Sequence, residues 1–383
     1  MPIPRDEPGQ SWVPASSRFA ESLDRHTAVG SLWRAEGGKV RCFACGHRCL
    51  IGLGRRGVCK VRLNSAGQLR VPFGYVSGAA CDPVEKKPFY HLLPGSGALT
   101  FGMFGCDFHC AYCQNWITSQ ALRDESAGTR IQPITSDELV GAAQRQGARL
   151  MVSSYNEPFI TSEWAAEVFA RARPAGLVCG FVSNGNATRE ALDFLEPWLQ
   201  AVNIDLKTFD DRRYRSLGGT LERVIGTIRD AHARGIWVEV VTLLVPGFND
   251  TEAELRAMAR FLVSVSPDIP WHVTAFHPDY RMKEPRATEA GDLVRAAEMG
   301  VAEGLRFVYA GNLSGRVGHW EDTRCSGCGQ TLVRRRGFRM IEDRLSPRGC
   351  CPGCGRSIPG IWAAAGESRR ESGMLDRRNA LST

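Results

Sequence analysis

The chain has 383 residues, a net charge of +7 and 43% hydrophobic residues, enough for one large folded domain with smaller modules. It lacks an apolar run of about 20 residues, the length that spans a bilayer, so no transmembrane helix is expected. The N-terminal segment also lacks the apolar stretch of a secretory signal. We therefore expect a cytoplasmic protein without a membrane partner.

Fourteen cysteines are many for a cytoplasmic chain, and most of them fall into three tight groups. Spacings of two or three residues suit metal ligation better than disulfides, which need an oxidising compartment. Cys81 and Cys179 stand apart from the groups. Isolated cysteines usually behave as small buried apolar side chains, and we expect both to do so.

Residues 1–38 are predicted to form an irregular or weakly helical leader. Residues 39–96 form a module rich in cysteine and glycine, with short strands. This module offers four thiols and His47 as an alternative ligand; the thiols are those of Cys42, Cys45, Cys49 and Cys59. Four thiolates from one short segment could form a closed zinc site, and a second iron–sulfur cluster is the alternative. The end of the module, around residues 82–87, is expected to be a lid over a cavity.

Residues 97–315 alternate between short apolar runs and amphipathic segments. The apolar runs predict seven buried strands, within residues 98–105, 149–155, 177–185, 201–207, 237–245, 271–277 and 306–311. Helices are predicted within residues 136–148, 221–235 and 251–265; Thr135 with Glu138, and Thr251 with Glu254, have the spacing of a capping box. This alternation is typical of an α/β fold with a parallel sheet, here a partial (β/α)6 barrel resembling a TIM barrel.

The first predicted strand leads into the segment GMFGCDFHCAYCQNW, where Cys106, Cys110 and Cys113 follow the pattern C-x3-C-x2-C. Three thiolates can hold three irons of a [4Fe–4S] cluster and leave the fourth iron open, which is typical of a reactive site. The alternative is a zinc site completed by His109.

Polar residues follow the next predicted strands, where parallel strands bring them to one edge. They are Asn156, Glu157, Ser183, Asn184, Asp205, Lys207 and His277. Each one alone could end a strand or form a structural ion pair. Their recurrence at successive strand ends above a cysteine loop favours an active site.

The cysteine pattern, with Tyr112 before the last cysteine and a six-unit β/α region, resembles the signature of radical S-adenosylmethionine (SAM) enzymes. The resemblance implies a [4Fe–4S] cluster that reductively cleaves SAM to a 5′-deoxyadenosyl radical, which abstracts hydrogen from an unknown protein or small molecule. It also implies cofactor-binding roles for Tyr112, Asn156, Glu157, Ser183, Asn184, Asp205, Lys207 and His277. No side chain must act as a nucleophile, and Tyr155 and Cys81 are candidates for a proton donor or radical relay.

Residues 320–362 contain the knuckles CSGCGQ and CPGCGR, which predict a zinc-ribbon-like module. The predicted ligands are Cys325, Cys328, Cys351 and Cys354, with a rubredoxin-type iron site as the alternative. Cys350 is excluded by the knuckle spacing. Residues 363–383 are polar and without periodicity, so a disordered tail is expected.

The combination of these modules resembles the radical enzyme of the AmmeMemoRadiSam system, which is similar to pyruvate formate-lyase activating enzyme. The matching pieces include YNEP, DLK, LLVPGFND, WHVTAFHPDY and VYAGN. The resemblance implies a Memo-like and an AMMECR1-like partner, and a reductant such as flavodoxin or ferredoxin. The alternative is a non-catalytic zinc protein that binds nucleic acid or proteins through its terminal modules and its basic run at residues 334–336.

Overall fold

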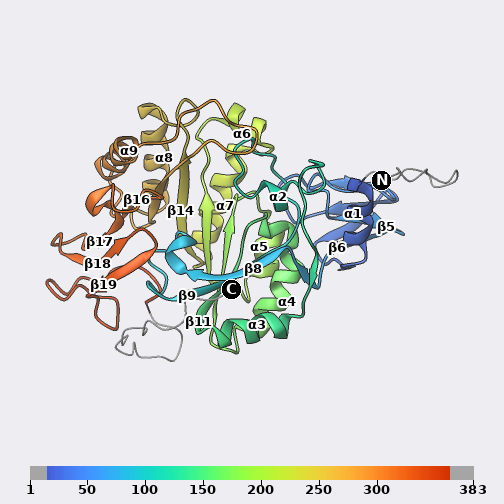
Figure 1. The fold of residues 1–383 in the computed structure, drawn as a ribbon, viewed down its shortest axis with the longest axis horizontal. Helices are drawn as coiled ribbons and strands as arrows, with labels where there is room; N and C mark the ends of the chain where they lie inside the picture. The colour runs from blue at the N-terminus through green and yellow to red at the C-terminus, as the bar shows by residue number, and fades with distance from the viewer. Residues whose placement is uncertain (1–14, 363–383) are drawn as a thin grey trace, which may run out of the picture.

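The computed structural model describes residues 15–362 and is built around an eight-stranded sheet (Figure 1). The strand order is β16-β15-β14-β13-β12-β11-β9-β8. All neighbours from β9 to β16 pair in parallel, and β8 is antiparallel to β9. The strands are β8 (Gly78–Pro83), β9 (Gly97–Gly102), β11 (Ala148–Ser153), β12 (Val178–Ser183), β13 (Ala201–Asp205), β14 (Trp237–Leu244), β15 (Trp271–Ala275) and β16 (Val308–Gly311).

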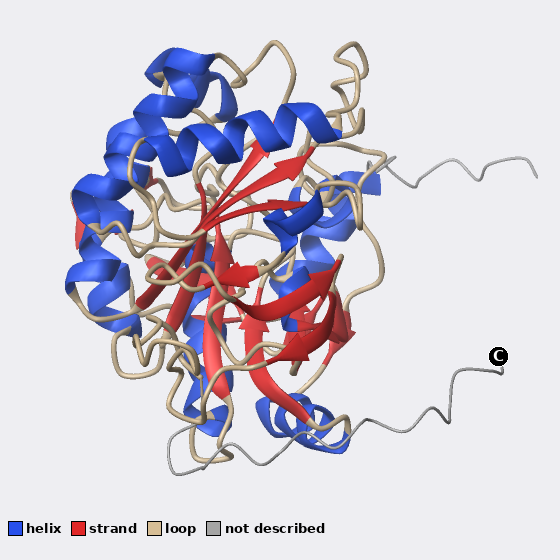
Figure 2. Cartoon of the chain, turned by 90° about the vertical axis from the view of Figure 1, so that its left-hand side faces the viewer, coloured by secondary structure: helices blue, strands red, loops and turns tan. Residues whose placement is uncertain are grey.

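The seven predicted strands all form, which confirms an α/β fold with a partial, barrel-like sheet. Helices follow most of the parallel strands and lie on the outer side of the sheet (Figure 2). They are α3 (Ser136–Arg145), α4 (Ser162–Ala172), α5 (Arg189–Leu195), α6 (Asp211–Leu217), α7 (Leu221–Ala233), α8 (Glu252–Val265) and α9 (Ala290–Ala302). The predicted capping box of Thr135 and Glu138 is present, whereas at α8 only the Thr251 hydroxyl accepts from the Glu254 amide.

The sheet is largely buried on both faces, because helices cover one face and the barrel interior closes the other. All five residues of β15 are buried, as are the side chains with which α8 packs on the sheet, including Leu255 and Leu262. Burying each such leucine contributes about 1.5–3 kcal/mol to folding. Among the residues that the structure describes, no helix is both long and apolar enough to cross a membrane.

The N-terminal module starts earlier than predicted. It comprises α1 (Ala15–Asp24), β1 (Thr27–Val29), β2 (Trp33–Glu36), β3 (Lys39–Cys42), β4 (Leu50–Ile51), β5 (Leu63–Ser65) and β6 (Gln68–Pro72). Strand β2 pairs with β3 through a turn at Gly37 and Gly38, whose φ angles of 56° and 74° favour glycine. Residues 27–29 and 33–36 are therefore strands of this module rather than part of the predicted leader.

Several short elements lie between the main helices and strands. Strand β7 (Tyr75–Val76) pairs with β10 (Gln132–Pro133), and the 3-10 helix η1 (Val84–Lys86) follows β8. The cysteine loop ends in the short helix α2 (Trp116–Ser119), and the 3-10 helix η2 (Pro158–Thr161) precedes α4. The first residues of the predicted leader and the tail predicted at 363–383 lie outside the described residues.

The C-terminal module consists of the 3-10 helix η3 (Gly318–Glu321) and a three-stranded sheet of β17 (Thr323–Arg324), β18 (Thr331–Arg336) and β19 (Arg339–Asp343). Leu332 and Val333 of β18 share a buried cluster with Tyr309 of β16 and Trp362. An isolated bridge between Leu92 and Ile361 ties the segment before β9 to the end of the module. The module is thus fixed against the barrel beside the edge strand β16.

Candidate functional site

The three-cysteine loop begins where β9 ends and lies against the N-terminal module. Gly105 has a φ of 91°, and a Cβ at this position would lie 2.9 Å from the Cys59 carbonyl oxygen and 2.7 Å from Val61. Only glycine fits this close approach without strain. The sequence therefore brings the backbones of the two cysteine-rich segments into contact.

The thiols of Cys106, Cys110 and Cys113 are buried or half-buried in this loop. Burial raises the pKa of all three, that of Cys110 to about 12. The Phe108 amide donates to the Cys106 sulfur over 3.4 Å, and the Ser119 hydroxyl lies 3.2 Å from the Cys113 sulfur. The sulfurs of Cys106 and Cys113 thus have polar neighbours, and a thiolate at any of the three positions would still need a cation to balance its charge.

The spacing of these sulfurs does not suit one metal ion. A tetrahedral ion with metal–sulfur bonds of about 2.3 Å needs sulfurs about 3.8 Å apart. Within residues 15–362, the one set of three or more ligand atoms that all lie within 4.8 Å of one another belongs to the C-terminal module. The loop cysteines, and His109 with them, are set wider. The three thiols fit the donor chemistry of an iron–sulfur cluster, and a zinc site completed by His109 stays the alternative.

Two asparagines from the turn after β12 position the loop through Asp107. The Asn184 side chain donates to one oxygen of Asp107 over 2.8 Å, and Asn186 donates to the other over 2.7 Å. The Asn184 amide nitrogen also lies 3.8 Å from the Cys106 sulfur. Asp107 is fully buried, so these hydrogen bonds are what offset the burial of its carboxyl group.

Glu157 forms a second support beneath the loop. Its carboxylate accepts from the Ser183 hydroxyl over 2.7 Å, the Asn184 amide over 2.7 Å and the Phe159 amide over 3.0 Å. Burial, and then the charge of Asp107, raises the pKa of Glu157 to about 8. Asn156 accepts from the Met103 amide over 2.9 Å. The predicted residues of β11 and β12 therefore converge, and their hydrogen bonds hold the loop.

Asp205 and Lys207, at the end of β13, form a half-buried ion pair of 2.8 Å. Burial alone would lower the pKa of Lys207, but the charges of Asp205 and Cys110 raise it, so the ammonium stays protonated near the cysteine. Tyr112 is buried and packs edge-to-face on Phe248, with ring centroids 5.8 Å apart. This places a cation and an apolar wall beside the loop.

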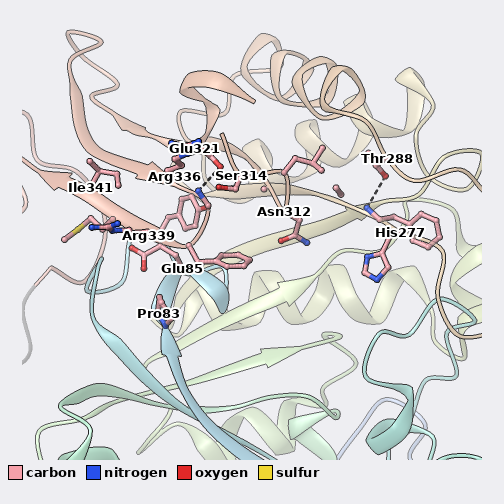
Figure 3. A pocket seen from close by; sticks show the side chains of 18 of the residues that line it. Pro83, Glu85, His277, Thr288, Asn312, Ser314, Glu321, Arg336, Arg339 and Ile341 are labelled. Carbon is pink, nitrogen blue, oxygen red and sulfur yellow. Dashed lines mark hydrogen bonds between the residues drawn. The ribbon is translucent and has the colours of Figure 1, made fainter. Parts of the chain in front are cut away.

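A cavity of about 1170 Å³ adjoins the loop at Gln114. Its wall includes Pro83 at the end of β8 and Gly311 at the end of β16, the two edge strands of the sheet. The cavity thus lies at the open side of the partial barrel (Figure 3). His277 stands on its rim, and its Nδ1 is 3.1 Å from the Gln114 amide nitrogen.

The hairpin of β18 and β19 forms the far wall of this cavity and contributes Arg336 and Arg339 (Figure 3). Both arginines are exposed, and within residues 15–362 neither has a carboxylate within ion-pair distance. Glu85 also lines the cavity, and its buried Oε2 has no hydrogen-bond partner. The cavity therefore offers two cations and one acceptor to a bound molecule.

Of the candidate relay residues, Cys81 lies on β8 and Tyr155 follows β11. The Tyr155 hydroxyl is 3.0 Å from the Lys87 ammonium, which in turn forms a 3.0 Å ion pair with Asp82. The thiol of Cys81 is only partly buried on β8, whereas that of Cys179 is fully buried as predicted. Cys81 packs against the core but is only half-buried, so its predicted burial is partial.

The proposed lid segment, residues 82–87, runs along the open side of the barrel. It contributes Pro83 and Glu85 to the cavity wall, while Lys86 is exposed and Lys87 is 4% exposed. Whether this segment moves stays a prediction.

The C-terminal thiols of Cys325, Cys328, Cys351 and Cys354 form a compact set, with 3.5 Å between Cys325 and Cys354 and 3.6 Å between Cys328 and Cys351. These distances are close to the edge of a tetrahedron around one ion. Cys351 belongs to the set and its neighbour Cys350 does not, as the spacing predicted.

Sequence reasoning missed Asp107, Asn186 and Ser119, all of which support the loop. Asp107 directly follows the first cysteine, and Asn186 lies in the VSNGN segment, so a signal was present for these two. The basic run differs from its expected form: Arg335 is buried against Tyr90 and Thr323, while Arg334 pairs with Glu342. Strand alternation splits the run between two faces.

Comparison with known proteins gives a consistent result. Residues 101–262 match the Radical SAM superfamily. An uncharacterised protein of Methanocaldococcus jannaschii is 35% identical over 324 residues, covering 84% of this chain and 95% of that protein. The isethionate sulfite-lyase activating enzyme of Oleidesulfovibrio alaskensis is 29% identical over 134 residues, covering 33% of this chain and 43% of that enzyme. A solved domain of pyruvate-formate lyase-activating enzyme from Bacteroides vulgatus superposes with a TM-score of 0.38 at 18% identity, over 42% of this chain and 98% of that domain.

Proposed function

Because the chain belongs to the radical SAM superfamily, we propose that it binds a [4Fe–4S] cluster through Cys106, Cys110 and Cys113, together with SAM, and removes a hydrogen atom from a substrate. When bound and reduced, these cofactors supply a one-electron cleavage that yields a 5′-deoxyadenosyl radical. The observation that carries the proposal is the loop at the strand ends, whose three thiols are set wider than a single ion needs.

The chain's own residues prepare this site in three ways. Asp107, held by Asn184 and Asn186, fixes the loop beside Cys106. The Lys207 ammonium offsets the negative charge of the thiolates. Tyr112 excludes water from one side. Asn156, Glu157 and Ser183 act here as positioning residues, because their side-chain hydrogen bonds already go to the protein.

The cavity at the open side of the barrel is the proposed substrate site. It reaches from Gln114, next to the last loop cysteine, to Arg336 and Arg339. Two unpaired guanidinium groups favour a substrate with an anionic group, such as a carboxylate or phosphate. The proposal also includes the Memo-like and AMMECR1-like partners and a flavodoxin or ferredoxin reductant, which follow from the sequence resemblance, and a cytoplasmic location.

The second candidate function, a non-catalytic zinc protein that binds nucleic acid, has less support. The compact C-terminal tetrad favours a single metal ion there. However, the basic run that would contact nucleic acid is interrupted by the buried Arg335 and the paired Arg334. The alternative also leaves the strand-end network around the three-cysteine loop without a role.

The test is anaerobic formation of 5′-deoxyadenosine. Purified protein is reconstituted with iron and sulfide, reduced with dithionite and given SAM, beside Cys113→Ala and Cys350→Ala variants. Cys350→Ala is the matched control, because this cysteine lies outside the metal-binding sets. We expect product from the wild type and the control and only background from Cys113→Ala. Zinc without iron in the reconstituted wild type, or equal product from all three proteins, would refute the proposal.

A further inference from the structure

A second group of cysteines lies in the N-terminal module. Cys42 ends β3, Cys45 and Cys49 lie in the loop to β4, and Cys59 follows a glycine-rich turn. The Cys42 amide donates to the Cys49 carbonyl over 2.9 Å, which closes the loop. Cys42, Cys45 and Cys59 are buried and Cys49 is half-buried. The Val58 amide, next to Cys59, donates to the Cys49 sulfur over 3.4 Å, so the segment of Cys59 packs against the loop of Cys49.

The distances between the sulfurs of this group distinguish a site for an iron–sulfur cluster from a site for a single metal ion. In the C-terminal tetrad the paired sulfurs are 3.5 and 3.6 Å apart, as one tetrahedral ion requires. No three sulfurs of the N-terminal group lie within 4.8 Å of one another, nor does any such set there include His47. A cubane cluster takes four cysteines, each on a different iron, and therefore needs sulfurs set wider. The N-terminal group shares this wide spacing with the three-cysteine loop.

The two wide sets are joined by direct contacts. The Gly46 amide donates to the Asn186 carbonyl over 2.8 Å, and Cys45 forms an isolated bridge with Ala187. The Asn186 side chain then donates to Asp107, the residue after Cys106. On the other side, the Cys59 carbonyl packs against Gly105. A continuous path of covalent and hydrogen bonds thus connects the N-terminal group with the three-cysteine loop.

The outer side of the same loop has the character of a docking surface. Leu50, Leu53 and Val58 are 41%, 68% and 39% exposed, although large apolar side chains are usually covered. Arg55 and Lys60 are exposed beside them, and within residues 15–362 neither has an ion-pair partner. An apolar patch with unpaired cations is complementary to an acidic protein surface.

We propose that Cys42, Cys45, Cys49 and Cys59 hold a second [4Fe–4S] cluster, and that it relays electrons from an acidic one-electron carrier protein docked over Leu50, Leu53 and Val58. The role of the relay rests on the proposed function; the second cluster does not. In each transfer the carrier loses one electron, the second cluster takes it up and passes it to the cluster of the three-cysteine loop. No proton or bond moves in the relay.

The first experiment counts metals in the full chain after anaerobic reconstitution. We expect roughly eight iron and eight sulfide per wild-type chain and about one zinc. A Cys110→Ser/Cys113→Ser variant and a Cys45→Ser/Cys59→Ser variant should each keep about half of the iron. About four iron and two zinc in the wild type, or iron that is unchanged in the Cys45→Ser/Cys59→Ser variant, would overturn the second cluster.

If the latter variant fails to fold, the Cys110→Ser/Cys113→Ser variant still decides the matter. Because it lacks the three-cysteine site, any [4Fe–4S] signal that it shows by Mössbauer spectroscopy must come from the N-terminal group. Loss of all iron from this variant would refute the proposal. This count holds even if the protein forms no 5′-deoxyadenosine, so its failure is distinct from failure of the proposed function.

The second experiment tests the relay with Leu53→Asp/Arg55→Glu, which reverses the charge of the surface without touching a cysteine. The readout is 5′-deoxyadenosine formed with reduced flavodoxin, divided by that formed with dithionite. We expect this ratio to fall at least about tenfold, since charge reversal at a docking surface slows association. Arg306→Glu, an exposed site elsewhere on the surface, is the control. An unchanged ratio would overturn the relay and the docking surface.

Discussion

Replacing Glu163 with alanine tests whether one buried ion pair holds the N-terminal module on the barrel. Arg62, just before β5, and Glu163, in α4, have side chains that are 1% and 6% exposed. The guanidinium donates to the two carboxylate oxygens over 2.7 and 2.6 Å. The same carboxylate accepts from the backbone amides of Ser31 and Leu32 over 3.1 and 3.3 Å.

The expected cost follows from what the substitution leaves behind. Removing the carboxylate leaves a buried arginine charge without its partner, which typically costs about 3–5 kcal/mol. Two amide donors lose their partner as well, so we expect a loss near the upper end, about 5 kcal/mol. The exposed pair of Arg306 and Asp268 is the control, because Asp268→Ala should cost less than about 1 kcal/mol.

The assay is urea denaturation of anaerobically prepared protein, followed by far-ultraviolet circular dichroism. We expect Glu163→Ala to lower the free energy of unfolding of the N-terminal module, and Arg62→Met/Glu163→Leu to recover much of the loss, since an apolar pair needs no charge compensation. The Arg62 guanidinium also donates to the Ile160 carbonyl over 2.9 Å. A loss below about 1 kcal/mol in Glu163→Ala would refute the reasoning that this pair is desolvated and that the carbonyl alone cannot replace the carboxylate.

Three further predictions concern the rest of the fold. Burial lowers the pKa of His91 to about 4, so as the pH falls the unfolded chain binds a proton before the folded chain does. The free energy of unfolding should therefore fall by up to about 3 kcal/mol between pH 6.5 and pH 4. Urea titrations should show a smaller fall in His91→Gln, and the same dependence on pH in both proteins would contradict this prediction. Asn184→Ala removes a support of Asp107 and should reduce iron retention after gel filtration, whereas Asn115→Ala, which makes no side-chain cap bond, should not; equal retention by both would count against the network. Cys328→Ala should lose about one zinc per chain and lower the melting temperature, while Cys350→Ala keeps both; unchanged zinc would remove the tetrad as its site.

The sequence was sufficient for the sheet and for the position of the site. Continuous apolar runs such as residues 237–245 predict buried parallel strands, and β14 forms there. Parallel strands end at one edge, which is why Asn184 comes close to Cys106, and Lys207 to Cys110, although the members of these pairs are 78 and 97 residues apart in the sequence.

Long-range pairing of side chains could not be predicted from periodicity. Glu163 looks like an ordinary surface residue of α4, and its partner Arg62 lies 101 residues earlier. Arg335 was assigned to an exposed basic run, yet the inward face of β18 directs it to Tyr90, 245 residues away. Such contacts depend on how the modules dock, which local patterns do not encode. A cavity beside residues 82–87 was predicted, but the contribution of the β18–β19 hairpin to its wall was missed for the same reason.

The most direct test of the central claim is electron paramagnetic resonance of the reduced, iron-loaded protein with and without SAM. Three cysteine ligands leave one iron free to bind another molecule, so we predict that SAM changes the signal of the cluster at Cys106, Cys110 and Cys113. In Cys110→Ser/Cys113→Ser, any signal that persists should not respond to SAM. A wild-type signal that SAM leaves unchanged, with no 5′-deoxyadenosine formed, would contradict the account.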